Sequence, residues 1–83
     1  TDHYHIGWGI EAEDEYGGEY CNSPDEAADV INSLIAKYKL DTEQITEDDI
    51  NKADDKGSDF FLNGEDWNIS CLILREVNDA DMD

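Results

Sequence analysis

Apolar residues recur along this chain with two different periods, and each period predicts its own type of element. Within residues 23–40 they recur at the three- and four-residue spacing of one helical face. Ser23 and Glu26 form an S-x-x-E capping box, and Pro24 suits the first helical position, so we predict that the helix begins there. Asn32 is expected on the solvent side. The predicted buried face consists of Ala27, Val30, Ile31, Leu34 and Tyr38.

A strict alternation of apolar residues with polar residues or glycines over residues 3–12 predicts a half-buried strand. A turn is expected over residues 13–18, where Gly17-Gly18 supplies the positive φ that a turn needs. The chain is then expected to return as a short strand over residues 19–21. Together these segments predict an N-terminal β-hairpin.

A second hairpin is predicted near the C-terminus. Residues 60–62 begin a strand, Asn63-Gly64 is a typical hairpin turn, and residues 67–77 form the longest strand. On that strand Leu72 and Leu74 lie on the opposite face from its other apolar residues. We therefore expect a central strand whose second face is covered by a loop, a partner chain or a target.

The order of these elements predicts an α+β fold, with about four mainly antiparallel strands and one main helix packed on the sheet, in the order β-β-α-(α)-β-β. The bracketed helix is a weaker signal over residues 41–53, capped by Thr46 and expected to be short and largely exposed. We expect residues 1–77 to form a single acidic domain and residues 78–83 to form an acidic C-terminal tail.

Charge changes this picture more than any other property. The chain has 23 acidic and 5 basic residues, a formal net charge of -18. Such a balance suggests disorder, but hydrophobic residues make up 39% of the chain and occur in periodic blocks, so a folded domain with an acidic surface is the better interpretation. Repulsion disfavours direct binding to nucleic acid or anionic membranes and favours a basic partner. No apolar run reaches the length of a membrane span, and we expect a cytoplasmic protein.

The sequence gives little support to catalysis or to a bound cofactor. The residues that would be available to hold zinc are His3, His5, Cys21 and Cys71. Their spacing matches no zinc motif, and the acidic runs fit no EF-hand register. The two cysteines are expected to be reduced thiols, since a bridge between them would require export to an oxidising compartment. Because no nucleophile or phosphate-binding motif is present, we expect a non-enzyme without metal or cofactor.

Acidic residues accompany every predicted element, so we expect the folded surface itself to contact the partner. The candidate contact residues are Glu11, Glu13, Asp14, Glu15, Glu19, Asp25, Asp29, Glu43, Glu47, Asp48, Asp49, Asp54, Asp55, Glu65 and Asp66. Glu11, Glu13 and Glu15 are expected to form a row spaced by ~6.7 Å along one strand, which suits a groove built for phosphates. Duplex DNA of the ~30 Å length of such a domain carries roughly 18 charges, which is the size of the protein's own net charge.

In size, charge and acidic blocks the chain resembles the small DNA-mimic inhibitors of phages and mobile elements, which include anti-CRISPR proteins, anti-restriction proteins and uracil-DNA glycosylase inhibitors. The resemblance implies an inhibitor that occupies the basic DNA- or RNA-binding groove of a host protein, with a Cas effector as the first expected target. Tyr16, Tyr20 and Trp67 are expected to supply apolar anchors at the contact. Two alternatives stay open: an immunity protein that neutralises a basic nuclease toxin, and an acidic or halophilic structural domain without a specific basic partner. The exposed Leu72 and Leu74 leave both a monomer and a homodimer open.

Overall fold

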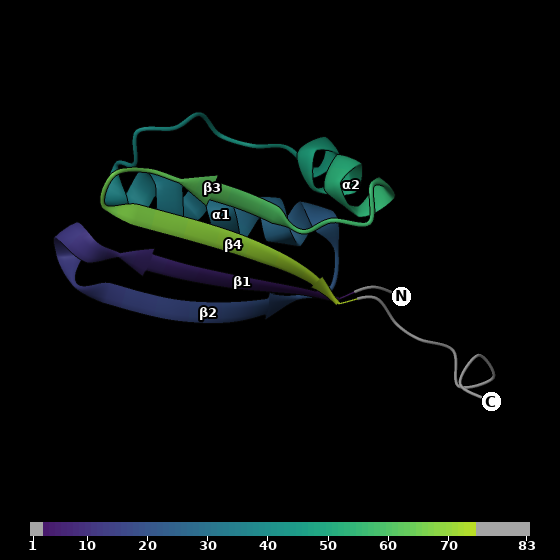
Figure 1. Ribbon diagram of the computed structural model, residues 1–83, viewed down its shortest axis with the longest axis horizontal. Helices are drawn as coiled ribbons and strands as arrows, with labels where there is room; N and C mark the ends of the chain where they lie inside the picture. The colour runs from purple at the N-terminus through teal and green to yellow at the C-terminus, as the bar shows by residue number, and fades with distance from the viewer. Residues whose placement is uncertain (1–2, 75–83) are drawn as a thin grey trace.

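A four-stranded sheet and two helices make up the residues that the computed structural model describes, 3–74 of the 83-residue chain (Figure 1). The elements in chain order are β1 (His3–Ile10), the 3-10 turn η1 (Glu11–Glu13), β2 (Glu15–Cys21), α1 (Pro24–Tyr38), α2 (Glu47–Asp55), β3 (Phe60–Asn63) and β4 (Trp67–Leu74). The strand order is β2-β1-β4-β3, and every neighbouring pair is antiparallel. The α+β class, the antiparallel sheet and the central position of β4 are confirmed. Residues 75–77 of the predicted last strand and the tail 78–83 lie outside the described residues.

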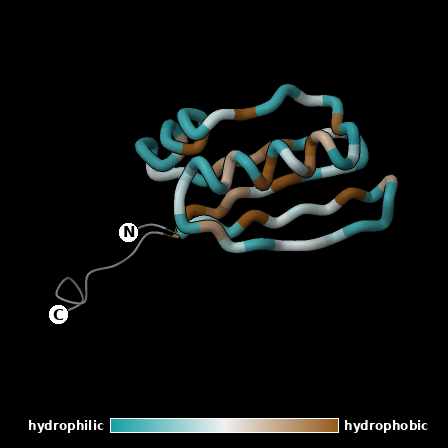
Figure 2. The backbone as a smooth tube through the Cα atoms, turned by 180° about the vertical axis from the view of Figure 1, so that it is seen from behind, coloured by the Kyte–Doolittle hydropathy of each residue, from teal (hydrophilic) through white to brown (hydrophobic). Residues whose placement is uncertain are grey.

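Helix α1 lies across one face of the sheet, behind the strands in Figure 1 and in front of them in Figure 2. The Ser23 hydroxyl accepts the Glu26 N–H at 3.3 Å, and the Glu26 carboxylate accepts the Asn22 N–H at 3.2 Å. Lys39, in the left-handed region at φ 52°, ends the helix after Tyr38. The predicted helix is confirmed. Its buried residues are Ala27, Ala28, Ile31, Leu34 and Ile35, whereas Val30 and Tyr38 are half-buried.

Asn32, which was expected on the solvent side of α1, instead holds the segment between the two helices. Its side-chain NH₂ donates to the Ile45 carbonyl and its side-chain oxygen accepts the Ile45 N–H, both at 2.8 Å. Ile45 is thereby fixed in the core with both backbone groups satisfied. The expectation for Asn32 is wrong because a polar side chain on a helix is also suited to pairing with buried backbone groups.

Helix α2 begins after Thr46, as predicted, and extends to Asp55. The Thr46 N–H donates to the Asp49 carboxylate at 3.0 Å, and the Asp49 N–H donates to the Thr46 carbonyl at 3.1 Å. The helix is largely exposed, as expected, while Ile50 is fully buried and Ala53 is half-buried. Ile50 makes α2 part of the core.

The N-terminal hairpin reverses at a different place from the prediction. β1 ends at Ile10, and η1 together with Asp14, at φ 53°, turns the chain. Gly17 and Gly18 lie inside β2, so the predicted turn over them is wrong. Gly17 is needed for packing, because a Cβ there would lie 2.5 Å from Cζ2 of Trp8 on the paired strand.

The second hairpin is confirmed, with its turn two residues later than predicted. The Gly64 N–H donates to the Trp67 carbonyl at 2.9 Å and closes a loop formed by Glu65 and Asp66. The Trp67 indole occupies the space that a Cβ on Gly64 would fill. Gly64 therefore permits a close approach of the indole, and the predicted Asn63-Gly64 turn is replaced by an acidic one.

The core lies between the sheet and the two helices. Its largest fully buried side chains are Ile6, Ile69 and Cys71 from the sheet, Ile31 from α1 and Ile50 from α2. Buried residues of both helices and of the central strands, β1 and β4, therefore form one core. The candidate site lies at one end of this core, where the β1–β2 connection, the end of α1 and the β3–β4 turn meet.

The second face of the sheet has no described helix over it, and it faces the viewer in Figure 1. It consists of the odd-numbered residues of β1 and β3 and the even-numbered residues of β2 and β4. These residues share one side because His5 pairs with both Tyr20 and Leu72, and Phe61 pairs with Ser70. We call this surface the open face. Among the described residues it contains no Asp, Glu, Lys or Arg.

Candidate functional site

No Asp or Glu in the described part of the chain is buried, so these carboxylates contribute to the surface. One group lies where the β1–β2 connection, the end of α1 and the β3–β4 turn meet. We call this group the acid end; its members are Glu11, Glu13, Asp14, Glu15, Asp41, Glu65 and Asp66. They come from segments that are far apart in sequence, so the fold creates the cluster.

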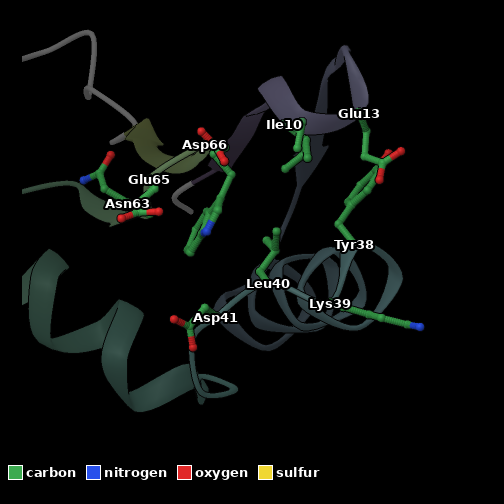
Figure 3. A pocket seen from close by; sticks show the side chains of 12 residues that line it. Ile10, Glu13, Tyr38, Lys39, Leu40, Asp41, Asn63, Glu65 and Asp66 are labelled. Atoms are coloured by element: carbon green, nitrogen blue, oxygen red, sulfur yellow. The ribbon is translucent and has the colours of Figure 1, made fainter.

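A hollow of about 570 Å³ lies within the acid end (Figure 3). Its apolar lining consists of Ile10, Ala12, Tyr38, Leu40 and Trp67. Its carboxylates are Glu13, Asp41, Glu65 and Asp66, with Lys39 as the basic residue of the lining. In Figure 3, Glu65 and Asp66 lie on one side of the hollow and Glu13 on the other, while Lys39 extends outward. The hollow therefore combines aromatic walls with an acidic rim.

Backbone hydrogen bonds hold the segments around this hollow. The Glu11 N–H donates to the Asp66 carbonyl at 2.8 Å, which joins η1 to the β3–β4 turn. The Leu40 N–H donates to the Ile35 carbonyl at 3.0 Å, which turns the chain at the end of α1 and leads it to Asp41. Glu13, Glu65 and Asp66 thus lie in short connections between strands, and Asp41 lies near the start of the segment that joins the two helices.

An acidic rim around aromatic walls suits a cationic side chain. Carboxylates accept charge-assisted hydrogen bonds from ammonium and guanidinium groups, and aromatic faces attract the same cations. The Tyr38 ring already has such a neighbour, since Nζ of Lys37 lies 5.1 Å from its centroid. An Arg or Lys side chain of a partner that entered the hollow would meet Trp67 and the carboxylates together.

The remaining predicted contact residues lie away from the acid end. Glu19 and Asp29 line a second hollow of about 320 Å³ between β2 and α1. Asp25 is in the first turn of α1, and Glu43 lies between the helices. The acidic residues of α2, at the far end of the sheet in Figure 1, are Glu47, Asp48, Asp49, Asp54 and Asp55. The structure therefore divides the predicted set into separate groups.

The predicted row of Glu11, Glu13 and Glu15 along one strand is wrong. Glu11 and Glu13 belong to η1, whereas Glu15 begins β2 after the left-handed Asp14. The same reversal brings Glu13 to the hollow. Asp41 was missed by the sequence reasoning, and its position just beyond the predicted helix end was the signal that would have found it.

The predicted aromatic anchors are also divided by the fold. Trp67 is half-buried and lines the acidic hollow. Tyr16 and Tyr20 are exposed on the open face, where the Tyr20 ring lies 4.7 Å from the ring of His5 between centroids. Only Trp67 is therefore placed to contact a ligand of the acid end.

The histidines and cysteines that were considered for zinc lie on opposite sides of the sheet. His3 and His5 belong to the open face, whereas Cys21 and Cys71 are free thiols buried in the core. Burial raises the pKa of Cys71 to about 12, with further contributions from Cys21 and Asp59, and burial also raises the pKa of Cys21. Within residues 3–74 no group of His, Cys, Asp and Glu is arranged to hold a metal ion.

None of the helices that the structure describes is long and apolar enough to cross a membrane. Comparison with known proteins finds no matching protein family, no matching curated protein and no matching solved structure. The chemistry of the acid end is therefore the basis on which a function is proposed.

Proposed function

We propose that this protein is an inhibitor that binds the basic nucleic-acid-binding groove of another protein and excludes the nucleic acid. The acid end makes the central contact, and a Cas effector is the first partner to test. The protein itself does not need to catalyse a reaction for this role.

The observation that carries the proposal is the convergence of carboxylates from three chain segments around one aromatic-walled hollow. A groove that binds nucleic acid is lined by Lys and Arg, which pair equally well with carboxylates and with phosphates. Backbone hydrogen bonds of Glu11 and Leu40 hold the segments that carry Glu13, Asp41 and Asp66, so less backbone entropy is lost on binding. Trp67 adds an aromatic surface for one of the basic side chains.

The net charge of -18 supports the same role through the rate of association. Complementary charge steers two proteins together and raises the association rate constant by roughly 10- to 1000-fold at low ionic strength. The complex should therefore weaken as salt rises, because screening removes both the steering and part of the contact energy. Nucleic acid should compete with this protein for the groove.

The proposal is tested in two steps. The immobilised protein is exposed to host lysate, proteins eluted by salt are identified by mass spectrometry, and a purified candidate is then titrated by calorimetry with and without its DNA or RNA. A nucleic-acid-binding protein that binds one molecule of inhibitor and is displaced by its nucleic acid is the expected result. A partner that binds inhibitor and nucleic acid at the same time would contradict competition at the groove.

Two variants with the same change in charge separate the acid end from net charge. The site variant carries Glu13→Gln, Asp41→Asn, Glu65→Gln and Asp66→Asn. The control variant carries Asp25→Asn, Glu47→Gln, Asp48→Asn and Asp55→Asn, all of which are exposed. The site variant should raise the Kd about 30-fold or more, and the control much less. Equal losses in both variants would show that net charge acts without a defined contact at the acid end.

A further inference from the structure

The open face carries all five large hydrophobic side chains that are exposed among the described residues. They are Tyr16, Tyr20, Phe61, Leu72 and Leu74. Scattered exposed apolar residues are ordinary, but their concentration on one sheet face is a feature of interaction surfaces. This face differs from the acid end, which lies at the ends of the strands, and the two border each other at Asn63.

The same face lacks acidic side chains within residues 3–74, although the chain has a net charge of -18. Asp59, just before β3, directs its carboxylate to the β4 backbone, where it accepts the Ile73 N–H at 3.0 Å. The open face is therefore a surface of this acidic molecule on which two copies could meet without placing carboxylates in contact.

A basic partner does not fit this surface. Lys and Arg side chains that docked here would lose water and find no carboxylate in return, which is unfavourable. They would find carboxylates at the acid end instead. A face without acidic side chains packs best against another face of the same kind. The open face of a second copy is such a face.

The shape of the face also favours a second copy. Gly18, Gly7 and Ser70 form a low row across β2, β1 and β4, with Ser70 donating to the Gly7 carbonyl at 3.4 Å. Larger side chains border this row, with Phe61 at its β3 end and Tyr20 and Leu72 in the neighbouring row through His5. In a two-fold arrangement the Tyr20 ring of each copy can lie over the row of small residues of the other. Such an interface is self-complementary, as two-fold symmetry requires.

The available area is that of a modest dimer. The four strands have 8, 7, 4 and 8 residues. At a rise of ~3.3 Å per residue and a spacing of ~4.8 Å between strands, they give a footprint of roughly 430 Å² before the height of the side chains is counted. Tyr16, Tyr20 and Phe61 are 66%, 72% and 56% exposed. At ~200 Å² per ring they alone offer roughly 400 Å² of surface. A standard interface buries ~800 Å² per partner, so this face supplies a substantial part of one.

We propose that two copies of this chain pair through their open faces. The product has two sheets about 10 Å apart at its centre, as in a β-sandwich, and the helices on the outside. Both acid ends stay exposed at the margins, so the dimer presents two of them. This pairing does not depend on the proposed function, because it uses neither the acid end nor a basic partner.

Salt should act on this pairing in the opposite sense to binding of a basic partner. The two protomers carry the same charge and repel each other over a Debye length of ~10 Å at 0.1 M salt, but over only ~3 Å at 1 M. Apolar contacts are not screened, and salt therefore favours the dimer. We expect the dimer Kd to fall about tenfold or more between about 0.1 M and about 1 M NaCl.

Sedimentation equilibrium of the full chain over this salt range, at several protein concentrations and with reductant present, tests the proposal. Wild type should shift from monomer toward dimer as salt and concentration rise. A wild type that stays monomeric throughout, or that associates less as salt rises, would overturn it. Reductant excludes dimers formed by cysteine oxidation.

A matched pair of variants locates the interface. Asn68→Glu places a carboxylate on the open face, and Asn51→Glu places one on the exposed side of α2, so both change the net charge equally. Asn68→Glu should raise the dimer Kd at least about tenfold relative to Asn51→Glu. Tyr20→Ser with Phe61→Ser should also abolish the dimer while circular dichroism stays native. Equal dimerisation of the two Glu variants would refute the open face as the interface.

Discussion

Asn32→Ala should destabilise the protein strongly, because the Asn32 side chain ties Ile45 to α1 through both of its backbone groups. The two hydrogen bonds are 2.8 Å long, and the Ile45 side chain is buried at 8% exposure. Removal of the amide leaves two possibilities. Either the Ile45 N–H and carbonyl stay inside without partners, or the segment detaches and Ile45 loses its burial.

Both outcomes lead to a similar loss in the free energy of unfolding. Two lost hydrogen bonds at a net ~1 kcal/mol each, with part of the penalty for unsatisfied groups, amount to about 3 kcal/mol. Exposure of a buried Ile side chain costs ~1.5 to 3 kcal/mol by itself. We therefore expect a loss of about 3 kcal/mol in the free energy of unfolding. In a domain of this size that corresponds to a Tm lower by about 12 to 24 °C.

Urea unfolding followed by tryptophan fluorescence measures this loss, with Asn51→Ala as the control. Asn51 is an exposed residue of α2, so the same substitution there changes helix propensity but breaks no such pair. The difference between the two variants isolates the contribution of the Asn32–Ile45 bonds. A difference below about 0.5 kcal/mol would refute the reasoning, because changes of that size are typical of unconnected surface positions.

Two further predictions concern the core thiol and the glycines. The pKa of Cys71 is raised to about 12 from 9.0, so its contribution to stability is complete below pH 9 and is lost as pH rises toward 12, because the unfolded chain releases the proton first. In this range the free energy of unfolding of wild type, measured with urea, should fall by about 1.4 kcal/mol per pH unit more than that of Cys71→Ala. Equal pH dependence of the two proteins would contradict this prediction. Gly64→Ala should cost about 1 to 3 kcal/mol and shift the Trp67 fluorescence, because the indole must move. Gly57→Ala should cost less, ~1 kcal/mol, because Gly57 has positive φ and open space around it; a larger loss at Gly57 than at Gly64 would contradict the packing argument.

Residues with a strong local preference behaved as the sequence predicted. The start of α1 is set by three residues close together in the sequence, Ser23, Pro24 and Glu26. The start of α2 is likewise set by its N-cap residue, Thr46. The alternation along β1 and β4 predicted their buried faces, since a strand side chain has only two directions. These features need no information from distant parts of the chain.

Turns and polar contacts were predicted less well because distant residues decide them. Gly17 and Gly64 were interpreted as turn residues, yet both are small because Trp8 and Trp67 occupy the space beside them. Asn32 was assigned to solvent because its partner, Ile45, lies 13 residues away along the chain. In each case the local signal was real, but its cause was a tertiary contact.

The acidic character of this protein and its α+β class follow from the sequence alone, because net charge is a sum over residues and helices and strands follow local periodicity. Tertiary structure alone decided where the charge gathers and where it is absent. The pairing of β1 with β4 brings Glu13 and Asp66 to one end of the sheet, and the pairing of β1 with both β2 and β4 puts Tyr20 and Leu72 on one face without described acidic residues. Such groupings depend on which strands are neighbours, and long-range packing determines that order.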